Sequence, residues 1–103
     1  MKIQHIVLLK CRESLTDNDF ALVLNDLKTL RALIPGITEV SGGDNNSPEG
    51  IASGYTHAFV IVFEDEAARA AYLPHPEHKK IQAKIASILA DEPSNVLVFD
   101  YSA

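Results

Sequence analysis

The sequence predicts an α+β fold with the element order β-α-β-β-α-α-β, the ferredoxin-like plan, in which a four-stranded antiparallel sheet carries helices on one face. Two observations carry this prediction. Four segments have the alternating or β-branched pattern of strands, and apolar residues recur at helical spacing between the first and second strands and between the third and fourth. The length of 103 residues fits one compact domain, so residues 1–103 are expected to form a single domain.

The first two elements are a strand and a long helix. Residues 2–11 alternate as a strand whose middle is apolar on both faces. Residues 16–34 repeat apolar side chains every three or four positions, which indicates a helix. Thr16 is a favourable N-cap, and the Pro-Gly pair at 35–36 ends the helix.

Two more strands follow, separated by a loop. Residues 37–43 predict a weak strand near an edge of the sheet. Residues 44–54 are rich in Gly, Asn, Ser and Pro, which is typical of a loop. Residues 55–63, YTHAFVIVF, combine aromatic and β-branched residues and predict the clearest strand of the chain.

The last part of the chain predicts two short helices and a strand. The first helix runs from about 66 to 73, with Asp65 as its cap and a proline directly after it. Pro76 fits the first position of a second helix that runs to about 90, because its missing N–H would be unpaired there anyway. Residues 95–101 form the final strand.

The sheet face turned away from the helices is expected to be apolar. A patch of that size is rare on the surface of a soluble monomer, and covering it would contribute many kcal/mol. We therefore expect a homodimer with a two-fold interface between sheets; the alternative is that loops cover this face. The expected interface consists of Ile6, Leu8, Val60, Val62, Leu97 and Phe99, with Ala58 and Tyr101 on the same face.

Composition and charge exclude several classes of protein. The net charge is −5, and no basic run is longer than Lys79-Lys80, which argues against nucleic-acid binding. The apolar stretches are far shorter than a membrane span. Cys11 is the only cysteine, so an internal disulfide is impossible and a nucleophilic role has no support. With no leader pattern after Met1, a cytoplasmic protein is expected.

The stretch AYLPHPEHKK, residues 71–80, carries the groups best suited to chemistry. Tyr72 and His78 lie on the inward stripes of the two short helices, and the proline break between them lets both side chains face one cavity. The nearby helix N-terminus is expected to lower the pKa of His78, leaving a neutral imidazole that can act as a general base. A tyrosine hydroxyl can donate a hydrogen bond to a carbonyl or an enolate. The alternative is a buried hydrogen bond between the two side chains that braces the break.

The other histidines have simpler interpretations. His57 lies on the helix-facing side of its strand, either as a second polar group of the cavity or as a core histidine with a local partner. His5 faces Asp100 if the outer strands pair antiparallel, which predicts a His5–Asp100 pair. Because His5 and His57 lie toward opposite ends of their strands, we expect no zinc site with His78, and no metal or cofactor.

Five motifs resemble one family in order and spacing: HIVLLK, SPEG, GYTHAFVIVFED, AYLPHPEHKK and VLVFDY. Together they resemble the stress-responsive α/β-barrel domain family, often called Dabb. The resemblance covers nearly the whole chain and implies a ferredoxin-like protomer and a dimeric α/β barrel. Most members have no assigned reaction. In one branch, the plant olivetolic acid cyclases, a tyrosine and a histidine act as acid and base without a metal, and their positions match Tyr72 and His78.

Two functions follow as expectations. The first is a homodimeric domain whose small apolar pocket binds an unidentified small molecule. The second is a cofactor-free cyclase or lyase that acts on a carbonyl compound through Tyr72 and His78. The helix at 16–34 brings aliphatic residues where the cyclases have bulky aromatics, which disfavours a tetraketide substrate. The residues expected around the ligand are His5, Val7, Leu9, Val23, Leu24, Leu27, His57 and Phe59.

Overall fold

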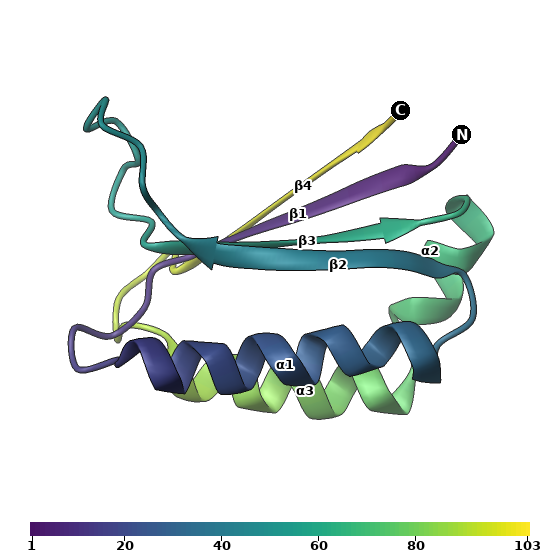
Figure 1. The fold of residues 1–103 in the computed structure, drawn as a ribbon, viewed down its shortest axis with the longest axis horizontal. Coiled ribbons are helices and arrows are strands. Elements are labelled where there is room, and N and C mark those ends of the chain that lie inside the picture. Colours follow the sequence, from purple (N-terminus) through teal and green to yellow (C-terminus); the bar gives the residue numbers. More distant parts are fainter.

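The computed structural model describes all 103 residues and has the predicted order of elements (Figure 1). The strands β2, β3, β1 and β4 lie in that order in one antiparallel sheet, so the ferredoxin-like plan is confirmed. No helix combines the length and the hydropathy needed to cross a membrane. The elements are β1 (Ile3–Leu9), α1 (Asp17–Leu33), β2 (Ile37–Asp44), β3 (His57–Phe63), α2 (Glu66–Tyr72), α3 (Pro76–Ile88) and β4 (Val96–Ser102).

The helices begin where the sequence predicts their caps. The hydroxyl of Thr16 accepts from the backbone N–H of Asp19 at 3.0 Å, and the Asp19 carboxylate accepts from the Thr16 N–H at 3.1 Å, a reciprocal capping box. Asp65 caps α2. His75 caps α3, because its Nδ1 accepts from the backbone N–H of Glu77 at 3.1 Å. Observed and predicted boundaries therefore agree closely at the helix starts.

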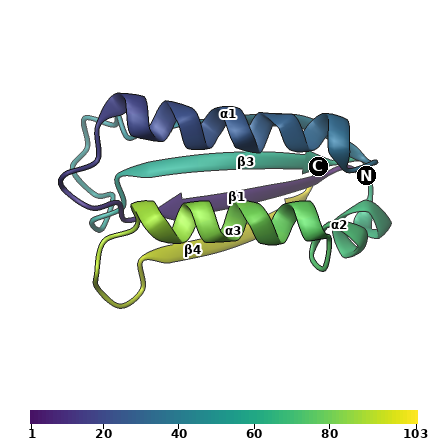
Figure 2. The same ribbon diagram turned by 90° about the horizontal axis from the view of Figure 1, so that it is seen from below.

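All the helices lie on one side of the sheet. Figure 2 shows α1 and α3 side by side across that face, with β4 emerging beyond the edge of α3. Because α1 packs along β2, and α3 runs beside it, the core lies mainly between α1 and the strands. Its completely or almost completely buried side chains are Leu9, Leu27, Leu30, Ile34, Ile61 and Phe63.

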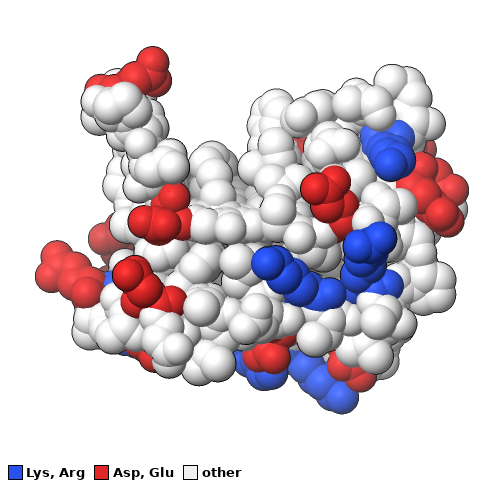
Figure 3. Space-filling model, viewed as in Figure 1, with Lys and Arg blue, Asp and Glu red and all other residues white.

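The opposite face of the sheet is apolar and is most exposed on β4, whereas Val62 of the predicted interface is already buried within the single chain. Ile6 pairs with Val60 on one side and with Phe99 on the other, so these three side chains share the outer face. Phe99 is 65% exposed. The loop between β2 and β3 rises from one end of this face, and Figure 3 shows a hollow beside it with few charged groups. The loop therefore does not cover the predicted interface as a whole.

Candidate functional site

A cavity of about 320 Å³ lies between α3 and the helix-facing side of strands β1, β3 and β4. Its walls are mainly apolar, and its polar groups gather where α2 meets α3. The lining residues are His5, Val7, Phe59, Tyr72, Leu73, His78, Gln82, Ile85, Ala86, Leu89, Val96 and Val98. A volume of this size is at the lower end of the range for small-molecule sites.

Three rings form the polar end of the cavity. The ring of Tyr72 stacks on the ring of His78, with centroids 3.9 Å apart and planes inclined by 28°. His5 meets the edge of the same tyrosine at 5.9 Å. Tyr72 therefore contacts both histidines.

His78 is held by one ring nitrogen and free at the other. Its Nδ1 lies 2.9 Å from the carbonyl oxygen of Leu73, and a carbonyl can only accept, so Nδ1 carries the proton. Nε2 has no hydrogen-bond partner. Every buried side-chain polar atom without access to solvent is hydrogen-bonded, so Nε2 must be accessible. In the neutral ring, Nε2 therefore presents a lone pair to the cavity.

Burial governs the protonation of this ring. Removal from water lowers the pKa of His78, and the Leu73 carbonyl opposes the shift by stabilising the charged form. The pKa of His78 is lowered, as the sequence predicted, but the main cause is burial and not the helix N-terminus. The side chain is therefore neutral near neutral pH, as a general base requires.

The hydroxyl of Tyr72 is also free of protein partners. No hydrogen bond to this oxygen occurs, yet the oxygen is not sealed off. Burial, and secondly the negative charge of Asp100, raise the pKa of Tyr72, so the hydroxyl stays protonated and can donate. The predicted alternative, a Tyr72–His78 hydrogen bond across the helix break, is wrong: the rings stack, and His78 braces the break through the Leu73 carbonyl.

The predicted His5–Asp100 pair is present. Asp100 lies opposite His5 in the β1–β4 ladder, and the His5 Nδ1 is 2.8 Å from one carboxylate oxygen of Asp100. The other oxygen accepts from a guanidinium nitrogen of Arg69 at 3.1 Å. Arg69 extends this pair to α2 and was not anticipated from the sequence.

Five of the residues expected around the ligand lie elsewhere. Leu9, Val23 and Leu27 are buried in the core, and Leu24 packs at its margin. His57 packs on Phe20, with ring centroids 4.3 Å apart, and its Nδ1 bonds to the neighbouring Thr56 hydroxyl. The physical reason is that α1 lies over the β2 side of the sheet, whereas the cavity lies under α3 on the β4 side.

Seven lining residues were missed. Gln82 and Ala86 follow one face of α3, Leu73 lies at the break, and Val96 and Val98 are helix-facing on β4. Two of these residues, Ile85 and Leu89, could have been predicted, because they continue the inward-facing stripe of α3 that begins at His78. Since β4 extends past α3, its helix-facing valines form a wall of the cavity instead of core.

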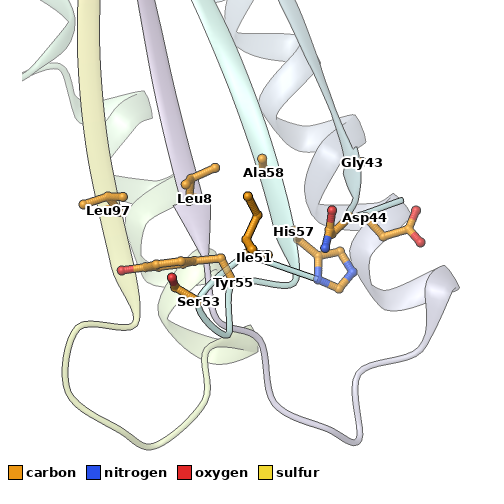
Figure 4. A pocket seen from close by; sticks show the side chains of 11 residues that line it. Leu8, Gly43, Asp44, Ile51, Ser53, Tyr55, His57, Ala58 and Leu97 are labelled. Carbon is orange, nitrogen blue, oxygen red and sulfur yellow. The ribbon is translucent and has the colours of Figure 1, made fainter. Parts of the chain in front are cut away.

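A second hollow of about 320 Å³ lies on the opposite side of the sheet. Figure 4 shows Leu8, Ala58 and Leu97 side by side across three strands, with Ile51 and Tyr55 of the β2–β3 loop next to them. The Tyr55 hydroxyl donates to the carbonyl of Ser94 at 3.0 Å, which ties this loop to the loop before β4. The hollow belongs to the apolar outer face, and His57 and Asp44 are among the polar residues that line it. No group of three or more His, Cys, Asp or Glu side chains in the molecule is arranged to hold a metal ion.

Comparison with known proteins gives consistent matches over the whole chain. The profile of the family described as "Stress responsive A/B Barrel Domain" matches residues 3–103. The stress-response A/B barrel domain-containing protein HS1 of Arabidopsis thaliana is 28% identical over 99 residues, which is 96% of this chain and 87% of that protein. Olivetolic acid cyclase of Cannabis sativa is 24% identical over 102 residues, covering 99% of this chain and 97% of the cyclase. Among solved structures, a protein from a Jannaschia species, described as dimeric, ferredoxin-like and of unknown function, superimposes with a TM-score of 0.86 at 25% identity over 100% of both chains.

Proposed function

The chain belongs to the stress responsive A/B barrel domain family, and on that basis we propose that it forms a homodimer and binds a small, largely apolar carbonyl compound in the cavity under α3. The observation that carries the proposal is the composition of this cavity. Unpartnered polar atoms of His5, Tyr72 and His78 gather at one end, and aliphatic walls form the remainder.

The arrangement of these groups selects the ligand class. The Tyr72 hydroxyl donates and the neutral Nε2 of His78 accepts, so together they suit a carbonyl group with an adjacent acidic C–H or O–H. Ile85, Leu89 and Val98 provide apolar contacts for a short alkyl chain. A methyl ketone with a chain of a few carbons, such as 2-heptanone, fits both requirements.

The proposed dimer uses the outer face of the sheet. Leu97, Phe99 and Tyr101 are each about half or more exposed there, on a chain too small to leave such a patch uncovered without cost. The Jannaschia protein and a Thermobifida fusca protein that is 30% identical are both described as dimeric. A second copy placed sheet to sheet would cover the apolar hollow of Figure 4.

The binding proposal is tested by filling the cavity. Ala86 lines the cavity, whereas Ala83 is exposed on the same helix and does not. In thermal unfolding with 2-heptanone, wild type and Ala83→Phe should be stabilised, by about 2.7 kcal/mol at a concentration of 100 Kd, and Ala86→Phe should not be. Equal stabilisation of all three proteins, or of none, would show that the ligand is not held in this cavity.

A second candidate function is acid–base chemistry on such a ligand. It is favoured by the geometry of His78, whose Nδ1 is anchored, whose Nε2 is unbonded and whose ring stacks on that of Tyr72, and by the match to olivetolic acid cyclase. In the proposed step, Nε2 removes a proton from the carbon next to the carbonyl. The electron pair of that C–H bond forms the C=C bond of an enolate, and the Tyr72 hydroxyl stabilises the oxyanion.

This chemistry is tested by exchange of the α-protons of 2-heptanone for deuterium in D₂O, followed by NMR. Wild type should accelerate the exchange, and His78→Gln should lose roughly 10²-fold or more of that acceleration. His57→Gln is the matched control, because His57 lies outside the cavity. If His57→Gln is as defective as His78→Gln, or if wild type does not exceed free imidazole, the proposed step is refuted.

A further inference from the structure

Both cavity histidines are held through Nδ1, but by different kinds of partner. His78 donates to the neutral carbonyl of Leu73 at 2.9 Å, whereas His5 lies 2.8 Å from a carboxylate oxygen of Asp100. The Nδ1 of His5 therefore faces an anionic acceptor, and the Nδ1 of His78 faces a neutral one. The two rings therefore differ in the charge of the group that fixes their tautomer, although both have an unbonded Nε2.

Arg69 completes the support behind His5. It lies on α2 three residues before Tyr72, so both side chains leave the same side of the helix. Its guanidinium contacts one oxygen of Asp100 at 3.1 Å while His5 contacts the other, so the carboxylate is held from both sides. With its orientation fixed, Asp100 can accept only from Nδ1 of His5, which leaves the Nε2 of that ring for the cavity.

We propose that Arg69 is a positioning residue: by fixing Asp100, it holds His5 as the Nδ1–H tautomer, with Nε2 available to the cavity as a second proton-carrying group beside His78. The proton-transfer part rests on the acid–base chemistry proposed above. In the reaction, Nε2 of His5 first takes up a proton from solvent; when His78 removes the α-proton, this Nε2–H gives its proton to the enolate oxygen, which yields the neutral enol. His5 is then neutral with its proton on Nδ1, still bonded to Asp100, and the proton taken by His78 returns to the pair through solvent.

The structure also indicates that a lysine at position 69 should preserve the role of Arg69. Only one guanidinium nitrogen contacts Asp100, so the two-pronged geometry unique to arginine is not used. Arg69→Lys therefore preserves the charge and the single contact, whereas Arg69→Met keeps the aliphatic stem and removes both. Arg31→Met is the matched control, because Arg31 is an exposed arginine on α1 without an ion-pair partner.

The first readout is the tautomer of His5 in two-bond ¹H–¹⁵N spectra of the imidazole rings. Wild type, Arg31→Met and Arg69→Lys should show Nδ1–H at His5, and Arg69→Met should show a mixture with Nε2–H, while His78 keeps Nδ1–H in all of them. A role for Arg69 in stability alone would lower the melting temperature without changing this spectrum, and would overturn the proposal. An Nε2–H tautomer at His5 in wild type would also overturn the proposal, and this measurement does not depend on the folding of any variant.

The second readout is deuterium exchange of 2-heptanone by the same four proteins. Arg69→Met should lose about tenfold or more of the acceleration, and Arg69→Lys should recover most of it. If wild type gives no exchange but Arg69→Met still changes the His5 tautomer, the acid–base function fails and the positioning role stands. If wild type exchanges and Arg69→Met exchanges equally fast, His5 does not carry a proton in the reaction.

Discussion

Substitution of Phe99 by glutamate should dissociate the proposed dimer. An aromatic side chain buries roughly 150–250 Å² when fully covered. Phe99 is 65% exposed in the single chain, so a partner could cover about 130 Å² more of it, worth about 3 kcal/mol at ~25 cal/mol per Å². Because a two-fold interface contains the residue twice, the loss is about 6 kcal/mol per dimer.

That loss corresponds to an increase of roughly 10⁴-fold in the dimer dissociation constant, since each 1.4 kcal/mol is a factor of ten. Sedimentation velocity over a range from nanomolar to high micromolar protein measures it. Leu22→Glu is the control, because Leu22 is 57% exposed on α1, away from the sheet face. The reasoning is refuted if Phe99→Glu sediments as wild type does, or if Leu22→Glu dissociates to the same extent.

Three further predictions concern single side chains. In chemical denaturation, Gly42→Ala should destabilise the fold by about 1–3 kcal/mol, because the added methyl group would lie 2.7 Å from the carbonyl oxygen of Ala58. Gly43→Ala is the control and should be close to neutral, because its methyl group would have no atom within 4 Å. Tyr72→Phe should leave the melting temperature almost unchanged, since no protein group bonds to the hydroxyl, and should weaken binding of 2-heptanone in calorimetry; a large fall in melting temperature would contradict a free hydroxyl. Burial lowers the pKa of His78 below its ordinary value of 6.5. The contribution of this side chain to stability is therefore complete above that value and is lost as the pH falls toward the pKa of the folded state. Urea midpoints should accordingly fall less between pH 7.5 and pH 5 for His78→Gln than for wild type.

Local chemistry made the elements and one contact of the site predictable. Thr16, Asp65 and Pro76 mark helix starts by mechanisms that involve only neighbouring residues, and all three lie where expected. The pairing of His5 with Asp100 was also predictable, because the alternation of two neighbouring strands fixes which side chains face each other once the register is assumed. The first kind of prediction depends on neighbouring residues, and the second on the register between two strands.

The cavity was less predictable, because alternation identifies a face of the sheet but not which helix lies over each strand. Leu9 and His57 have the correct face and the wrong neighbours, since α1, which carries Val23, fills the space above them. Arg69 was missed for a similar reason. Its contact with Asp100 depends on the angle at which α2 leaves β3, which no spacing in the sequence encodes.

The apolar pattern of β4 links the two surfaces on which the proposals depend. An edge strand in a two-layer fold usually has one polar face, yet β4 has valines on the helix side and Leu97, Phe99 and Tyr101 on the other. In the single chain neither side is covered: Val98 is 55% exposed beyond α3, and Phe99 is more exposed still. Since exposure of both sides would make this edge a site of aggregation, each side needs its own cover. A second copy suits the broad outer face, and a small ligand suits the narrow cavity between α3 and the valines.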